Sequence, residues 1–296
     1  MAKKINYQEL KEEEIVSEIM KKKEFSDLPK KDVLMVYSQF KDIELVEERI
    51  KKTRELLMKM YTVFVSNKLL NLKDKSVDWF LNRHKSTKER LGSYEEVYQR
   101  ILFGVDEIFD NNNSLLAHPP AQYLSKISEE IKGRQKSGKI QIIDFGCGVN
   151  GFSYGFFGEV GQDIYYLGIE PVGQLVDLQN DWFEKKGFDG KCIKASLFDL
   201  KEIGKIVSKT KTPRIGFFFK VLDSLEMLKR DYSKTVLKEL VPLIDKGVVS
   251  WATKSLGDRK KIFATKKWLK EFIEKNFKVI EEFEIGGENY LVFQGK

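Results

Sequence analysis

Two glycines and three acidic residues occur in an order that is typical of nucleoside-binding proteins. Gly146 and Gly148 follow Asp144 in "DFGCG", directly after the apolar run "KIQII". Glycine at such a place allows either a sharp turn of the backbone or the close approach of a ligand. Glu170 lies twenty-two residues after Gly148, where a carboxylate accepts hydrogen bonds from the hydroxyls of a bound ribose, and Asp199 in "SLFDL" would lie near the base. These spacings predict a nucleoside site, although a plain tight turn would also explain the glycines.

These residues fall at the ends of predicted strands. From residue 139 onward, short apolar segments alternate with segments of helical spacing, which predicts an α/β fold with a mostly parallel sheet covered on both faces. Ligands of such sheets bind at the carboxyl ends of the strands. We expect strands at 139–146, 164–171, 191–199, 214–222 and 247–253, helices at 172–187, 200–209, 224–243 and 264–276, and a hairpin at 277–295 that makes the last strand antiparallel.

The segment before the sheet has a different texture. Residues 1–132 read as a helical domain, in which 43–70 has apolar residues at helical spacing and would form one long amphipathic helix. The polar stretch "GRQKSG" at 133–138 predicts a hinge into a second domain, 139–296.

The charge of the chain points to a polyanionic partner without proving one. The net charge is +7 and the sequence pI is about 9.0. Residues 51–90 hold eleven Lys or Arg against four acids, and 254–278 hold nine against three. Solvated helix surface would explain either zone alone, whereas two zones on one chain favour nucleic acid.

Composition also bounds the cellular setting. The chain has two cysteines, which argues against a disulfide framework and favours a reducing compartment. Its first residues do not form the apolar core of a signal peptide, and no run approaches the roughly 18 apolar residues that span a bilayer. We therefore expect a cytoplasmic protein, and we expect a monomer.

The glycine turn followed by two acids resembles the class I S-adenosylmethionine-dependent methyltransferases. An NAD-dependent enzyme is the main alternative, but its single acid leaves Asp199 without a role. Three further blocks, "HKSTKERL" at 84–91, "FFFKVLDSLE" at 217–226 and "VVSWATKSLGDR" at 248–259, resemble the aminoglycoside-resistance 16S rRNA guanine-N7 methyltransferase family. This resemblance covers roughly residues 80 to 295, with the blocks in the same order. It implies a Rossmann-like methyltransferase domain preceded by a helical RNA-binding domain, S-adenosyl-L-methionine as cofactor, and small-subunit rRNA as partner.

The resemblance also implies roles for individual residues. Arg90 would hold the methionine carboxylate of the cofactor, and the other cofactor-binding positions would be Asp144, Gly146, Gly148, Glu170, Asp199 and Leu200. The positions important for activity would be Lys220 and Glu226. The positions suited to RNA would be His84, Lys88, Lys254 and Arg259. On the residues alone, Arg90 would be a helix-surface charge, and Glu226 an acid favoured at a helix start.

Two departures from the family pattern leave the target open. Gly151 replaces a proline in the first loop, and Asp223 replaces a proline after the fourth strand, which adds a carboxylate near the expected site. Guanine N7 has a free lone pair, so a triad or metal cluster, neither of which is visible in the sequence, is not required. Another rRNA nucleotide, a small-molecule or protein substrate, and a non-catalytic RNA-binding factor remain alternatives, as does a housekeeping role instead of resistance.

Overall fold

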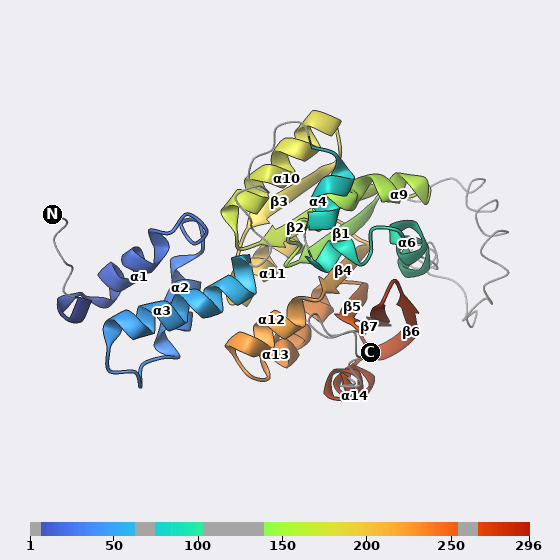
Figure 1. The fold of residues 1–296 in the computed structure, drawn as a ribbon. Coiled ribbons are helices and arrows are strands. Elements are labelled where there is room, and N and C mark those ends of the chain that lie inside the picture. The colour runs from blue at the N-terminus through green and yellow to red at the C-terminus, as the bar shows by residue number, and fades with distance from the viewer. Residues whose placement is uncertain (1–6, 63–74, 84, 103–138, 254–265) are drawn as a thin grey trace.

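A computed structural model describes residues 7–62, 75–83, 85–102, 139–253 and 266–296. Its centre is a seven-stranded sheet with the order β3-β2-β1-β4-β5-β7-β6 (Figure 1). All neighbouring pairs from β3 to β5 are parallel, and β7 runs antiparallel to both β5 and β6. The mostly parallel sheet with an antiparallel last strand is therefore confirmed. The strands are β1 Ile140–Phe145, β2 Ile164–Glu170, β3 Gly190–Lys194, β4 Arg214–Phe219, β5 Lys246–Ala252, β6 Lys278–Ile285 and β7 Glu288–Gln294.

Helices precede the sheet and connect its strands. The first group is α1 Glu12–Met20, α2 Lys30–Ser38, α3 Val46–Leu57, α4 Val77–Arg83, α5 Lys85–Lys88 and α6 Tyr94–Leu102. The second group is α9 Gly155–Glu159, α10 Gly173–Lys186, α11 Leu200–Ser208, α12 Val221–Leu228, α13 Tyr232–Leu240 and α14 Lys267–Asn276. Four short segments complete the secondary structure: η1 Tyr7–Glu9, η2 Met58–Thr62, η4 Asn150–Tyr154 and η5 Val241–Leu243. No helix among the described residues is long and apolar enough to cross a membrane.

Three expected elements differ in the structure. The helix expected at 224–243 is divided into α12 and α13, because Asp231 takes a left-handed conformation with φ of 60° that an α-helix cannot continue through. The helix expected at 43–70 is regular only to Leu57 and continues as the π-helical turn η2; residues 63–70 lie outside the described part of the chain. The third strand ends at Lys194 instead of reaching Asp199.

The helices before the sheet share its hydrophobic core. Tyr98 of α6 stacks on Phe157 of α9 with ring centroids 3.9 Å apart, and also on Phe217 of β4 at 6.0 Å. One continuous cluster of buried side chains runs from Ile15 in α1 through α6 to Val292 in β7. Consequently the described helices of the 1–132 segment pack as part of the same body as the sheet.

The loop after β1 explains why Gly151 stands where the resembled family has proline. Its N–H donates to the side-chain oxygen of Gln179 at 2.9 Å, and Gln179 in turn donates to the carbonyl of Gly148 at 2.8 Å. A Cβ at this position would collide with the Gln179 side-chain oxygen and lie 2.9 Å from Phe183. Proline would remove the N–H as well, so α10 and this loop are adapted to glycine.

We predict that Gly151→Ala lowers the free energy of unfolding by about 1–3 kcal/mol, because an inserted methyl group overpacks a buried site. Gly151→Pro should cost more, because it also leaves the Gln179 oxygen without its donor. Gly155→Ala is the matched control, because no atom lies within 4 Å of a Cβ at exposed Gly155. Urea unfolding of the three variants tests this, and equal midpoints for Gly151→Ala and Gly155→Ala would contradict it.

Candidate active site

A cavity of about 280 Å³ lies at the carboxyl ends of the parallel strands. Its wall includes the glycine loop after β1, the end of β2, the segment after β3, the end of β4 and one side of α12. The N-terminal helices also contribute, through Asp32 of α2 and Lys59, Met60 and Tyr61 of η2. Figure 1 shows α1–α3 extending to one side of the sheet. The cavity is thus where the sequence predicts a ligand, with walls from both halves of the chain.

The glycine loop needs glycine for conformation and for space. Gly146 has φ of 72°, and its N–H and that of Cys147 both donate to the carbonyl of Ile169 in β2, at 2.8 and 3.1 Å. A Cβ on Gly146 would lie 2.5 Å from a methyl carbon of Val221 in α12. Since Gly146 and Gly148 both line the cavity, the loop that makes the tight turn also forms part of the cavity wall.

Glu170 ends β2 at the cavity, beside this loop. Its two carboxylate oxygens accept N–H groups from Gly148 at 2.9 Å and Val172 at 3.0 Å. Burial raises the pKa of Glu170 to about 7; the two backbone donors oppose this shift, and nearby Asp144 adds to it. The carboxylate is therefore rigidly oriented and changes its charge near neutral pH.

Asp144 does not line the cavity; instead its hydrogen bonds support the glycine loop. One of its oxygens accepts from Asn150 at 2.8 Å and from the Tyr166 hydroxyl at 2.6 Å, and the residue is 1% exposed. Burial raises its pKa, while the two hydrogen bonds oppose the shift. Asn150 links Asp144 to Arg90, because its side-chain oxygen accepts a hydrogen bond from Arg90.

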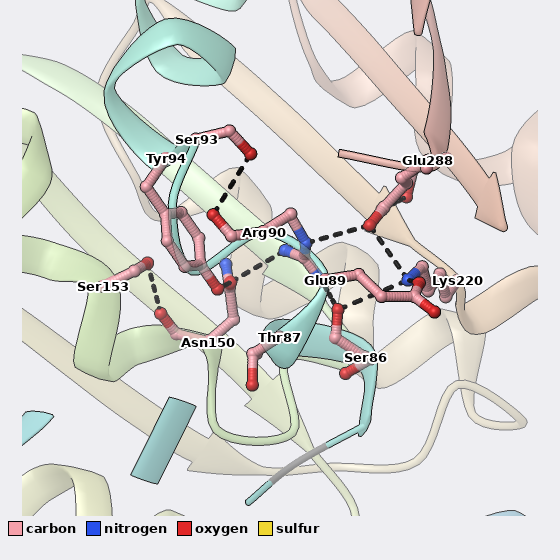
Figure 2. Close-up of polar contacts among 12 residues, drawn as sticks. Ser86, Thr87, Glu89, Arg90, Ser93, Tyr94, Asn150, Ser153, Lys220 and Glu288 are labelled. Atoms are coloured by element: carbon pink, nitrogen blue, oxygen red, sulfur yellow. Dashed lines mark hydrogen bonds and ion pairs between the residues drawn. The ribbon is translucent and has the colours of Figure 1, made fainter. Parts of the chain in front are cut away.

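Figure 2 shows four charged residues packed together beside the cavity: Glu89, Arg90, Lys220 and Glu288, here called the Arg90 cluster. One Glu288 oxygen lies 3.2 Å from Nε of Arg90 and 3.0 Å from Nζ of Lys220. Lys220 also forms an ion pair with Glu89. The side chains of Arg90 and Glu288 are 1% and 0% exposed, so each buried charge depends on the other for compensation.

Of the two predicted cations, Lys220 lines the cavity and Arg90 does not. The guanidinium of Arg90 donates to Asn150 at 2.9 Å and to the carbonyl of Ser86 at 2.9 Å, so its donors face the protein. Lys220 caps α12 in a left-handed conformation with φ of 55°, which is strained for a residue with a side chain. The structure thus brings both predicted cations together but presents them differently.

The side chains of Glu226, which lies in α12, and of Asp199, which precedes α11, each cap the start of a helix. The oxygens of Glu226 accept the N–H groups of Asp231 at 2.7 Å and Ser233 at 2.9 Å, which satisfies the first turn of α13. Asp199 caps α11 by accepting from Glu202 at 3.4 Å, and it pairs with Lys31 at 3.4 Å. Neither is among the described residues that line the cavity.

The other predicted positions are placed as follows. Leu200 is half-buried and opens α11, and Lys88 is exposed at the end of α5. His84, Lys254 and Arg259 lie outside the described residues. Trp251 is 8% exposed and packs in the hydrophobic core. Asp223 lines the cavity and forms an ion pair with Lys266.

Two buried carboxylates of the site were missed by sequence reasoning. Glu288 lies in the closing hairpin, where an acid next to "GG" carries no signal for partners such as Arg90 and Lys220. Asp32 lies in the first forty residues, which match no recognised block. The described residues contain no cluster of His, Cys, Asp and Glu that could hold a metal ion.

Solved structures of rRNA methyltransferases have the same fold along nearly the whole chain. The 16S rRNA methyltransferase RmtF, in complex with S-adenosyl-L-homocysteine, is 17% identical, with 96% of this chain and 98% of that chain covered and a TM-score of 0.69. An rRNA methylase from Escherichia coli is 17% identical, with 97% and 100% covered and a TM-score of 0.67. The 16S rRNA methylase RmtB is 16% identical, with 97% and 99% covered and a TM-score of 0.68.

No protein-family model and no curated protein sequence matches the chain. The similarity is therefore one of fold, and it includes the helices before the sheet as well as the sheet itself. The class I methyltransferase fold expected from the sequence is confirmed.

The pKa of Glu170 predicts a pH dependence of stability. It is about 7 in the folded protein against an ordinary value of 4.5, so the folded state binds more protons between these values. The contribution of Glu170 is fully present below pH 4.5 and is lost as the pH rises through 7. Glu170→Gln should therefore gain roughly 2–3 kcal/mol relative to the wild type between pH 4.5 and 8. Urea unfolding across this range measures the difference; Glu271→Gln, at an exposed site, should follow the wild type. A Glu170→Gln difference that is constant with pH would refute the assignment.

We also predict that Glu288→Gln destabilises the fold by about 3–5 kcal/mol, because it leaves Arg90 buried without a counter-ion. Glu282→Gln is the control from the same hairpin. Its ion pair with Lys270 is about 40% exposed on both sides, so its loss should cost no more than about 1 kcal/mol. Thermal and urea unfolding at low and high salt test the pair, and equal losses would show that Glu288 does not carry the buried charge balance.

Proposed function

We propose that this protein is an S-adenosyl-L-methionine-dependent methyltransferase of small-subunit rRNA that methylates guanine N7 in the decoding region. The observation that carries the proposal is the cavity at the carboxyl edge of the sheet, bordered by the glycine loop and Glu170, in a chain whose whole length has the fold of RmtF. The co-linear blocks at 84–91, 217–226 and 248–259 and the net charge of +7 support the rRNA substrate. The same resemblance supports a cytoplasmic, monomeric enzyme that acts on the assembled small subunit.

The residues of the cavity fit a nucleoside-containing cofactor. Gly146 lets the loop pack closely against Val221, which a Cβ would approach to 2.5 Å, and Gly148 brings backbone to the cavity wall. Glu170 offers two oxygens, each already oriented by one backbone N–H, that can accept the hydroxyls of a ribose. Lys220 supplies a positive charge suited to a carboxylate at the opposite part of the cavity, and Arg90 positions Lys220 through Glu288.

S-adenosyl-L-methionine, when bound, supplies a methyl group on a positively charged sulfur that is a good leaving group. The chain then has to hold the acceptor atom in line with that methyl group, and positioning alone accounts for a large share of such rate enhancements. Guanine N7 carries its lone pair without losing a proton, so the site needs no general base. Phe219, Met227 and Tyr61 line the cavity and offer apolar and aromatic surface for a base splayed out of the RNA.

The experiment is a tritium-transfer assay with labelled S-adenosyl-L-methionine on intact 30S subunits, 70S ribosomes and naked 16S rRNA. We expect label in 30S subunits, at one decoding-region guanine on primer extension, with a rate that falls steeply with salt because several phosphates are neutralised. Glu170→Ala should weaken binding of S-adenosyl-L-homocysteine by about 1–3 kcal/mol in calorimetry, whereas exposed Glu271→Ala should not.

The outcomes separate the alternatives. Cofactor binding without label in any RNA would replace the rRNA substrate by a small molecule or a protein. Label at an adenine or at another guanine would retain the enzyme class and correct the target. No cofactor binding by the wild type would leave a basic binding protein with a methyltransferase fold.

A further inference from the structure

A second polar group of the cavity lies far from Lys220, at the end of β3. Asp32 of α2 accepts the Ser196 hydroxyl at 2.8 Å on one oxygen and 2.7 Å on the other, and it accepts the Tyr61 hydroxyl at 2.9 Å. All three residues line the cavity, and Asp32 is 1% exposed. We call Asp32, Tyr61 and Ser196 the Asp32 cluster. A buried carboxylate in a cavity wall is costly unless hydrogen bonds compensate for it, so the cluster is a built feature.

The order of the strands arranges the polar groups of the cavity along one line. The sheet order β3-β2-β1-β4 places the Asp32 cluster at β3, Glu170 at β2, the glycine loop at β1 and Lys220 after β4. Under the proposed function, on which this inference rests, the ribose lies at Glu170 and the charged amino-acid end lies toward Lys220. The base of the cofactor then extends the other way, to the β3 end.

Asp199, the acid expected near the base, makes its contacts outside the cavity. Because β3 ends at Lys194, Asp199 is displaced to the cap of α11, where it holds Glu202 and Lys31, and its side chain is 47% exposed. The cavity wall at this end consists instead of Ser196, Leu197 and Phe198. A base would thus meet apolar side chains and, as its charged acceptor, Asp32.

The Asp32 cluster has capacity for one more donor. A carboxylate has about four lone-pair sites, and the Ser196 and Tyr61 hydroxyls make three contacts with Asp32. Ser196 gives its proton to Asp32, so its oxygen is left as an acceptor, which the N–H of Phe198 uses at 3.1 Å. The cluster therefore presents acceptors to the cavity and suits an amino group, not a carbonyl.

We propose that Asp32, with Ser196, is the specificity determinant that accepts a hydrogen bond from the exocyclic amino group of the cofactor adenine. Helix α2 and η2 are on this account a wall of the cofactor site, in addition to any contact with RNA. Tethers hold α2 in place: the ion pairs of Lys31 with Asp199 and of Asp27 with Lys194, and the hydrogen bond from Gln39 to the carbonyl of Leu228 at 2.9 Å.

The test compares two ligands by calorimetry on the full chain: S-adenosyl-L-homocysteine and S-inosyl-L-homocysteine, in which an oxygen replaces the amino group. The variants are Asp32→Asn, Asp199→Asn and, as control, Asp27→Asn, which removes a tether but does not line the cavity. We expect the wild type and Asp27→Asn to prefer the adenosyl ligand by at least about tenfold, since a site built for a donor rejects an analogue without it. In Asp32→Asn the preference should fall below about threefold, because its amide can donate to the inosyl oxygen.

Three outcomes would contradict the proposed role of Asp32 or the function on which it rests. Equal preference in wild type and Asp32→Asn, or loss of preference only in Asp199→Asn, overturns the inference. If Asp32→Asn weakens both ligands by the same factor, Asp32 is a structural tether of α2 and the inference is wrong. If the wild type binds neither ligand, the proposed function itself fails, which is a different result from binding without discrimination.

Discussion

The arrangement of the site depends on the ion pairs that the buried carboxylate of Glu288 forms with Arg90 and Lys220. Its side chain is 0% exposed and lies within 3.2 Å of Arg90 and 3.0 Å of Lys220. These three residues come from the closing hairpin, from the segment before the sheet and from the end of β4. A charge buried without a partner is strongly unfavourable, so the three segments have to meet. The hairpin at the far end of the chain therefore helps to place the cation at the cavity.

A second set of buried polar contacts connects the N-terminal helices and the glycine loop to their neighbours. Asp32 is bonded to Ser196 after β3, while Asn150 connects Asp144 beneath the glycine loop with Arg90 in front of it. In each case a buried polar side chain connects segments that are far apart in the sequence. The glycine loop, the end of β2 and the start of α12 are consequently held as one rigid rim around the cavity.

This rim accounts for the chemistry that the fold can support. Methyl transfer to an atom with a free lone pair requires correct placement more than proton transfer. The cavity supplies fixed acceptors at Glu170 and Asp32 and a fixed cation at Lys220, with apolar surface between them. The pKa of about 7 for Glu170 means that hydrogen-bond donors from a ligand would favour its ionised form, which couples ligand binding to pH.

The sequence by itself determined the sheet, the glycine loop and the place of Glu170 and Lys220, because apolar β-branched runs and the glycines that end them act over a few residues. It carried no information on contacts that depend on a partner far along the chain. Glu226 and Asp199, which the sequence predicts as site acids, cap α13 and α11, since the strand and helix ends fall a few residues from where periodicity puts them. Glu288 and Asp32 carried no local signal, because only packing of segments at least 68 residues apart in the sequence brings their carboxylates to Lys220, Arg90 and Ser196. Local pattern decides which elements form, whereas burial of charge, which is defined only in the folded chain, decides which side chains make the site.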